Sequence, residues 1–361
     1  MFCSNCGNKL ADNANFCSGC GSKVIANAAA VETKTVATPT DNSNSSDTPD
    51  IEQMRLKAKE YRVNNKYELA IKDYTKIIEL SGGNGEDYVY RGLSYFLTND
   101  YDNAIKDFSK AMELLKETDD IADGYFLRGK AYYESGNYDN AIKDFSKAIE
   151  LRIEEDVADY YWRGITYYFN GDYDVAIKDL TKAIKLQGGK DAATFFVRGR
   201  ANFDKGGYDY AIKDYTRTIE LQDKEDADDY FWRGRAYCEN ENYDAAIKDH
   251  TKSIALREEE DAYDYCWRGI SWYRKGNSKN AYKDAEKALE IDPTLELATK
   301  LSNATKPGIF GQTLDLARTE MKNFFLNTSG DNGNTNSSIN WGNAAKAGSI
   351  AIGAYKFFKG K

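Results

Sequence analysis

Apolar residues recur along most of the chain with the spacing of one helix face. In one stretch, positions i, i+3, i+4, i+7, i+10, i+11 and i+14 hold Tyr101, Ala104, Ile105, Phe108, Ala111, Met112 and Leu115. This spacing predicts an amphipathic helix that buries one side. A second helical segment precedes it over 87–98, and Asn99-Asp100 forms the turn between them. The pattern therefore predicts a pair of antiparallel helices.

The same helix pair is repeated seven times. The second helices begin at Tyr67, Tyr101, Tyr138, Tyr173, Tyr208, Tyr243 and, in a degraded copy, Ser278. Consecutive starts are 34, 37, 35, 35, 35 and 35 residues apart. A period of this length is typical of solenoids, in which stacked units share a core that no single unit can bury. Such arrays present long surfaces to partners, so the pattern favours binding over catalysis.

Large, small and aromatic residues stand at fixed places within each unit. One copy has Tyr160, Gly164 and Tyr167 in its first helix and Ala176, Leu180 and Ala183 in its second. These residues resemble the tetratricopeptide repeat, and the resemblance covers residues 51–297. It implies an all-α fold, a right-handed superhelical solenoid of about seven helix pairs. Within 51–304, the segment after Pro293 is expected to form a capping helix.

The resemblance also implies where a partner would bind, because first helices of this family line a concave groove. Relative to the glycine of each first helix, the groove positions lie three before, one after and four after. The residues expected to form this surface are Phe126, Tyr133, Tyr161, Tyr168, Phe196, Arg200, Phe203, Phe231, Arg235 and Tyr273. An exposed aromatic row is typical of an interaction surface. The alternative is that tight packing between repeats buries much of the row.

Two further rows of residues are ionic. Arginine precedes the glycine in six copies, at Arg91, Arg128, Arg163, Arg198, Arg233 and Arg268. Aspartate recurs in the second helices, at Asp73, Asp107, Asp144, Asp179, Asp214, Asp249 and Asp284. The rows indicate either structural Arg–Asp pairs between helices or a ladder of anion-binding sites. We expect structural pairs, because a charge repeated in an array usually solves a repeated packing problem.

Four of the six cysteines form two C-x-x-C motifs near the N-terminus. Cys3 and Cys6 form the first, Cys17 and Cys20 form the second, and a glycine follows each pair. Four thiolates at this spacing are typical of a tetrahedral Zn²⁺ site, and the alternatives are two disulfides or four free thiols. The segment over 1–25 resembles a small zinc ribbon. We expect one structural Zn²⁺ whose four ligands leave no position for a catalytic water.

Charge and composition separate the repeats from their flanks. Residues 51–304 hold 39 basic and 50 acidic side chains, a net charge of −11, whereas residues 305–361 carry +4. An acidic array makes nucleic acid an unexpected partner, because phosphate binding needs clustered Lys and Arg. Residues 26–50 are rich in Ala, Thr, Ser, Asn and Asp, so we expect a flexible linker there.

The C-terminal end divides into two parts. Residues 305–340 are expected to hold a short amphipathic helix and a Ser/Asn/Gly linker, and residues 341–361 form an apolar, basic tail. The tail could make peripheral membrane contact, join a partner, dock on the acidic array or stay free. The sequence shows no signal peptide and no apolar run near the ~20 residues of a membrane span. We therefore expect a cytoplasmic protein.

Patterns that indicate catalysis are weak. The single histidine, His250, stands where other copies have Phe or Tyr, so we expect it in the core. No phosphate loop or dinucleotide fingerprint is visible. We expect a non-enzymatic scaffold that binds a protein or peptide in the groove, with the zinc ribbon as a second contact module. The alternative is a tether at a membrane surface or on nucleic acid, anchored by the ribbon or the tail.

Overall fold

A computed structural model describes residues 50–308, and this part of the chain contains fifteen α-helices and no strand. The first helices of the seven pairs are α1 (Ile51–Val63), α3 (Gly85–Leu97), α5 (Thr118–Glu134), α7 (Val157–Phe169), α9 (Ala192–Asp204), α11 (Ala227–Glu239) and α13 (Ala262–Arg274). The second helices are α2 (Tyr67–Ser81), α4 (Tyr101–Leu114), α6 (Tyr138–Leu151), α8 (Tyr173–Leu186), α10 (Tyr208–Leu221), α12 (Tyr243–Leu256) and α14 (Ser278–Ile291). The expected all-α array of seven helix pairs is confirmed.

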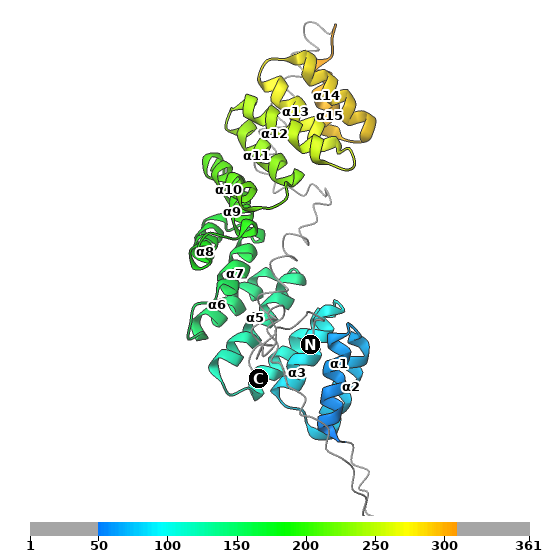
Figure 1. Cartoon of the computed structure of the whole chain (residues 1–361), viewed down its shortest axis with the longest axis vertical. Helices are drawn as coiled ribbons and strands as arrows, with labels where there is room; N and C mark the ends of the chain where they lie inside the picture. The colour runs from blue at the N-terminus through cyan, green and yellow to red at the C-terminus, as the bar shows by residue number, and fades with distance from the viewer. Residues whose placement is uncertain (1–49, 309–361) are drawn as a thin grey trace, which may run out of the picture. The chain divides into compact units, whose positions relative to one another are not determined.

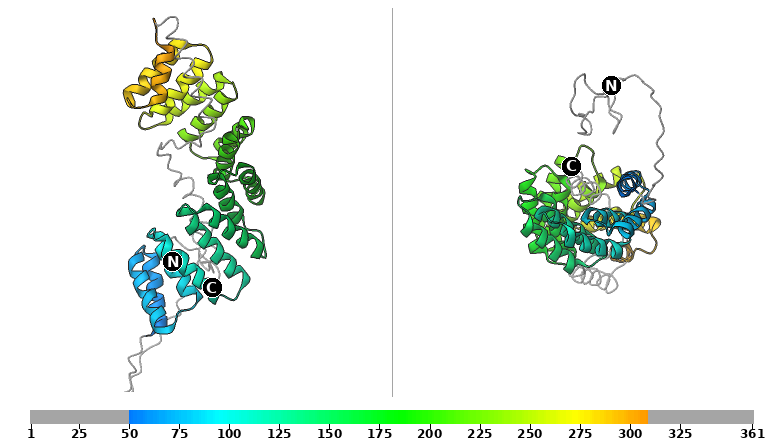
Figure 2. Two further views of the ribbon diagram at one scale, coloured as in Figure 1. Left: turned by 180° about the vertical axis from the view of Figure 1, so that it is seen from behind. Right: turned by 90° about the horizontal axis from the view of Figure 1, so that it is seen from below.

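Consecutive helices pack against one another throughout the array. Each helix contacts its neighbours in the chain, and first helices of adjacent pairs also meet, as α5 and α7 do. Figure 1 shows the pairs following one another in chain order, and the same order is visible from behind in Figure 2. Because the contacts are local, a site on the array is built from one repeat and its immediate neighbours.

The turn inside each of the seven pairs contains a residue in the left-handed region. Four copies use Gly136, Gly171, Gly206 and Gly276 there, with φ from 78° to 90°. Three other copies use Asn65, Asn99 and Glu241, with φ of 57°, 61° and 61°. Glycine adopts this conformation without strain and asparagine adopts it fairly often. Glu241 is therefore the least favourable of the seven residues at this position.

A glycine in each first helix from α3 to α13 lets the two helices of a pair approach closely. A Cβ atom at Gly164 would lie 2.9 Å from Cγ of Leu180, and one at Gly129 would lie 3.0 Å from Cε1 of Phe145. Leu180 and Phe145 are both fully buried, so neither can move aside into solvent. The glycine therefore sets the distance between the helices.

In six of the seven repeats, residues of the Arg and Asp rows form ion pairs between the two helices. Arg163 donates from Nε to Oδ2 of Asp179 at 2.6 Å and from Nη2 to Oδ1 at 2.9 Å. Its Nη1 donates to Oγ of Ser146, on the preceding second helix, at 3.2 Å. The same paired contact joins Arg91 to Asp107, Arg128 to Asp144, Arg198 to Asp214, Arg233 to Asp249 and Arg268 to Asp284. The structural interpretation of the two rows is confirmed.

Helix α15 (Glu296–Thr305) covers the end of the seventh pair. Its apolar residues Leu297, Ala298 and Leu301 are buried. A Cβ atom at Gly269 would lie 2.8 Å from Cδ2 of Leu301. Leu301 therefore fills the space beside the glycine that a residue of the second helix fills in other repeats.

Candidate interaction site

The ten residues expected in the binding groove all lie on first helices, from α5 to α13. We call this set the first-helix face. It comprises Phe126, Tyr133, Tyr161, Tyr168, Phe196, Arg200, Phe203, Phe231, Arg235 and Tyr273. The structure brings its members together from adjacent repeats: α5 contacts α7, α7 contacts α9 and α11 contacts α13, and Arg200 of α9 lies against Trp232 of α11.

Most rings of the first-helix face are buried, so the expected exposed row is wrong for them. The relative exposures are 4% for Phe126, 5% for Tyr161, 8% for Tyr168, 7% for Phe196, 9% for Phe203 and 6% for Phe231. Phe126 packs on Phe145 of its own repeat with ring centres 5.7 Å apart, and Phe196 packs on Tyr215 at 5.6 Å. These rings fill the space between the two helices of a pair, which makes them core residues.

Three members of the first-helix face remain half-buried, namely Tyr133, Arg235 and Tyr273. Tyr133 lies edge-on to Trp162 of the next repeat, with ring centres 5.4 Å apart. Parts of these side chains reach the surface where two repeats meet. The accessible part of the face is therefore narrower than the sequence indicates.

Two arginines and two tryptophans form a stack across three repeats. The guanidinium carbon of Arg200 lies 3.4 Å from the centre of the Trp232 ring. The guanidinium carbon of Arg235 lies 4.7 Å from Trp232 and 4.3 Å from Trp267. Trp232 and Trp267 are absent from the groove predicted by sequence, which considered only positions on one side of each helix. Both tryptophans stand two residues before the glycine of their first helix, and this shared position is the signal that could have revealed them.

Lys130 makes a similar contact nearer the N-terminus. Its Nζ lies 4.6 Å from the Trp162 ring centre and 5.6 Å from that of Phe96. Burial among these rings lowers the pKa of Lys130 to about 8. The ammonium group therefore keeps its charge at neutral pH, but it is poorly hydrated.

Arg235 also carries a buried positive charge that no carboxylate among residues 50–308 pairs with. Burial, together with the positive charge of Arg200, lowers its pKa to about 10. Arg235 forms no hydrogen bond or ion pair with any residue from 50 to 308. This isolation contrasts with the arginines of the structural row, each of which holds a carboxylate.

Several hydrogen-bond donors on or beside the first-helix face are buried without an acceptor among residues 50–308. They include Oη of Tyr161, Nε1 of Trp232 and Nε of Arg235. Similar atoms on His250 and Tyr215 lie deep in the core. A buried donor without an acceptor costs about 1–3 kcal/mol. Such donors beside a surface indicate a place where a ligand can supply acceptors.

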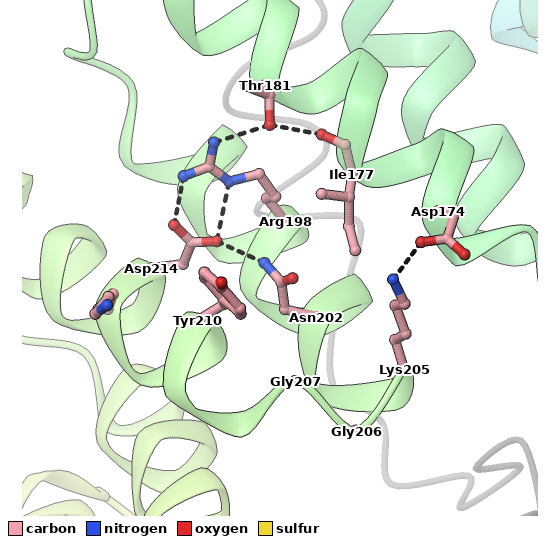
Figure 3. Close-up of a pocket in the computed structure, with 11 residues that line it drawn as sticks. Asp174, Ile177, Thr181, Arg198, Asn202, Lys205, Gly206, Gly207, Tyr210 and Asp214 are labelled. Carbon is pink, nitrogen blue, oxygen red and sulfur yellow. Dashed lines mark hydrogen bonds and ion pairs between the residues drawn. The ribbon is translucent and has the colours of Figure 1, made fainter.

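A hollow between α8, α9 and α10 is a weaker candidate (Figure 3). Its polar side chains bind one another: Arg198 pairs with Asp214, Asn202 donates to the same carboxylate at 3.1 Å, and Lys205 pairs with Asp174. The charges lining this hollow are thus largely compensated within the protein, which leaves little for a ligand to satisfy.

The residues that most often carry chemistry are core residues here. His250 is fully buried and its ring centre lies 5.7 Å from that of Phe231. Burial lowers the pKa of His250 to about 3, so the imidazole is neutral. Cys238 and Cys266 are buried free thiols, and burial raises the pKa of each. The prediction that His250 replaces a core ring is confirmed.

The predicted zinc ligands Cys3, Cys6, Cys17 and Cys20 lie outside the described residues. The same is true of the linker up to residue 49 and of residues 309–361, including the tail. Between residues 50 and 308, no group of three or more His, Cys, Asp or Glu side chains is placed to hold a metal ion. No helix in this range combines the length and the apolar character that a membrane crossing requires.

Family models for the tetratricopeptide repeat match residues 88–114, 122–152, 157–189 and 196–264. A zinc-ribbon domain model matches residues 2–24. A comparison with curated proteins finds no match.

Solved structures of repeat proteins are similar to this chain. The C-terminal part of a TPR repeat-containing protein from Cytophaga hutchinsonii aligns with 68% of this chain and 98% of its own length, with a TM-score of 0.57 and 21% identity. A tetratricopeptide repeat protein from Parabacteroides merdae aligns with 71% of this chain and 98% of its own, with a TM-score of 0.50 and 18% identity. At these identities the likeness establishes the fold alone. Taken with the family matches and the seven helix pairs, it identifies the chain as a tetratricopeptide repeat protein with an N-terminal zinc ribbon.

Proposed function

We propose that the chain is a non-enzymatic scaffold that binds protein or peptide partners along the first-helix face. The observation that carries this proposal is the set of buried donors without acceptors at that face, on Tyr161, Trp232 and Arg235. A bound peptide would supply the acceptors that buried polar groups normally have. The half-buried rings of Tyr133 and Tyr273 would add rigid apolar contacts.

The proposal can be tested with charge reversals at the face and away from it. The face variant carries Lys130→Glu and Arg235→Glu in the full chain. The matched control carries Lys110→Glu and Lys147→Glu, because both lysines are exposed on second helices and pair only with neighbouring glutamates. Affinity capture from cells, followed by mass spectrometry, compares both variants with the unaltered chain.

We expect the face variant to lose captured partners by about tenfold or more and the control to retain them, because interface energy is concentrated in a few central residues. Circular dichroism should show that both variants keep their helices. Equal capture by the two variants would place partner binding elsewhere on the chain.

We also propose that Cys3, Cys6, Cys17 and Cys20 hold one structural Zn²⁺. The zinc-ribbon match over 2–24 and the paired C-x-x-C motifs support this assignment. Thiolate ligands require a reducing compartment, which favours a cytoplasmic location.

Metal analysis under reducing conditions should find about one equivalent of zinc per chain. Replacement of Cys3 and Cys6 by serine should abolish the bound zinc without reducing the helical signal of the repeats. A natively purified chain that contains no zinc would contradict the proposal.

A further inference from the structure

We propose that Arg235, held between Trp232 and Trp267, binds the carboxylate of an Asp or Glu side chain within a peptide partner. This inference rests on the proposed binding at the first-helix face, and it names the chemistry that one position of that face recognises.

Arg235 differs from the arginines of the structural row because no carboxylate among residues 50–308 pairs with its guanidinium. In the structural row, each guanidinium donates to an Asp carboxylate at two points, as Arg233 does to Asp249 at 2.7 Å and 2.9 Å. Arg235, two residues further along α11, has no such carboxylate within residues 50–308. Arg235 stands one residue after the repeat glycine. From there its side chain lies between first helices of adjacent repeats, against Phe203 and Trp267, rather than between the two helices of its own repeat.

Two carboxylates whose charges act on Arg235 are engaged with other groups. Asp204 accepts a hydrogen bond from Oη of Tyr168 at 2.6 Å, and Glu239 pairs with Arg274 at 3.0 Å. Both stabilise the charge of Arg235 only through space. An incoming carboxylate would therefore meet a guanidinium that no neighbouring acidic group already occupies.

The two tryptophans orient Arg235 for such a ligand. Indole rings lie against its guanidinium at 4.7 Å and 4.3 Å, and Phe203 adds a third ring at 5.0 Å. A guanidinium stacked on rings keeps its N–H donors at the edge of its plane. A carboxylate matches that edge and can accept two of these hydrogen bonds. Because the surroundings exclude water, each such bond is stronger than at an open surface.

A second positive charge strengthens the case for an anion. Arg200 lies 3.4 Å from the Trp232 ring, and its charge lowers the pKa of Arg235. The two guanidinium groups therefore repel each other, and Asp204, 3.8 Å from Nη2 of Arg200, offsets only part of this repulsion. An anion bound at Arg235 would reduce this repulsion, which adds to the direct attraction between the carboxylate and the guanidinium.

The surroundings also restrict what kind of peptide fits. The repeats carry a net charge of −11, so a strongly acidic tract would be repelled by the array as a whole. First helices continue on both sides of α11, so a peptide can pass through the subsite rather than end in it. The chemistry therefore favours a single internal acidic residue flanked by apolar ones that can contact the nearby rings.

The test uses pools of nonapeptides with both ends blocked, randomised over Ala, Leu, Phe, Ser and Tyr. The central residue is fixed as Glu, Gln or phosphoserine, and a further pool has central Gln and a free C-terminal carboxylate. Each pool is mixed with the immobilised full chain, and the retained peptides are quantified by mass spectrometry.

We expect the Glu pool to be retained about tenfold more strongly than the Gln pool, as a charge-assisted hydrogen-bonded pair requires. Arg235→Gln should remove this preference while leaving the retention of the Gln pool unchanged. Arg235→Lys keeps the positive charge but lacks the planar set of N–H donors, so it should retain only part of the preference. Lys110→Gln, which removes an exposed charge on a second helix, should behave like the unaltered chain.

Three other results would overturn the inference, and they separate it from the proposed function. Equal retention of the Glu and Gln pools, both reduced by Tyr273→Ala, would support peptide binding but refute the carboxylate subsite. Stronger retention of the phosphoserine pool or the free-carboxylate pool would assign the subsite to phosphate or to a chain terminus. Retention of no pool above background would count against both peptide binding at this face and the subsite. If Arg235→Gln fails to fold by circular dichroism, an unchanged Glu preference in Arg235→Lys would refute the inference.

Discussion

Arg163 and Asp179 are joined at two points, with Nε–Oδ2 and Nη2–Oδ1 distances of 2.6 Å and 2.9 Å. The aspartate side chain is 6% exposed and the arginine side chain 19% exposed. Since Arg163 also donates to Ser146, one side chain connects the helices α6, α7 and α8. The equivalent pair recurs in six repeats and is the main polar link within each of them.

Loss of one partner from this pair should be costly. Arg163→Met leaves Asp179 buried without a cation, so we expect the free energy of unfolding to fall by about 3 kcal/mol or more. The double change Arg163→Met and Asp179→Leu should recover much of that loss, because no buried charge is left. Urea unfolding followed by circular dichroism measures both effects. Lys110→Met, at an exposed pair, is the control and should change stability by less than about 1 kcal/mol.

Gly164 is expected to tolerate no side chain. Although Gly→Ala inside a helix usually stabilises it, a Cβ atom here would lie 2.9 Å from Cγ of the fully buried Leu180. We predict that Gly164→Ala lowers the free energy of unfolding by about 1–3 kcal/mol. Adding Leu180→Val should restore part of the loss by making room. If Gly164→Ala is as stable as the unaltered chain, the helices of a pair are not held at this distance.

Asp229 lacks the cation that its counterpart has in the next repeat. Arg257 donates from Nε to Asp264 at 2.8 Å, whereas Gln222 stands at the corresponding place before Asp229. Asp229 is 4% exposed, and burial raises its pKa from 3.8 to about 7, with help from nearby acidic residues. Its charged form is therefore disfavoured in the folded chain.

This arrangement predicts a pH-dependent stability. Because the folded-state pKa of Asp229 lies above that of the unfolded chain, the folded chain binds the proton more tightly, and stability falls as pH rises from about 4 to about 7. Asp229→Asn should therefore be more stable than the unaltered chain by about 2–4 kcal/mol near pH 8, with the difference shrinking to about 1–2 kcal/mol near pH 5 and vanishing below about pH 4. Asp264→Asn is the matched control and should destabilise, since it removes the partner of Arg257. Thermal unfolding at the two pH values provides the measurement.

Replacement of Glu241 by glycine should stabilise the folded chain. Its φ of 61° is unfavourable for a residue with a Cβ atom, and glycine occupies the same turn position at Gly136, Gly171 and Gly206. We expect Glu241→Gly to raise the free energy of unfolding by about 1 kcal/mol. Gly171→Ala, at φ of 86°, should have the opposite effect. A neutral result for both changes would indicate that the turn relaxes to another conformation.

The sequence by itself predicted most of the array. The apolar stripe from Tyr101 onward and the period of about 35 residues predicted the helix pairs, because both signals depend only on local spacing. The Arg–Asp rows were also interpretable from sequence, since opposite charges repeated at one interval point to one repeated contact. His250 was placed in the core by comparison with the rings at the same position in other copies.

The tertiary structure alone decided which of these residues a partner can reach. Phe126, Phe196 and Phe231 have the spacing of a surface row, yet they are buried, because burial depends on how closely neighbouring helices approach. The isolation of Arg235 was equally invisible in the sequence. A stack of Arg200, Trp232, Arg235 and Trp267 requires side chains from three successive repeats to meet. Local periodicity determines which face of a helix is apolar, but only the packing of one repeat on the next determines which charges find a partner and which do not.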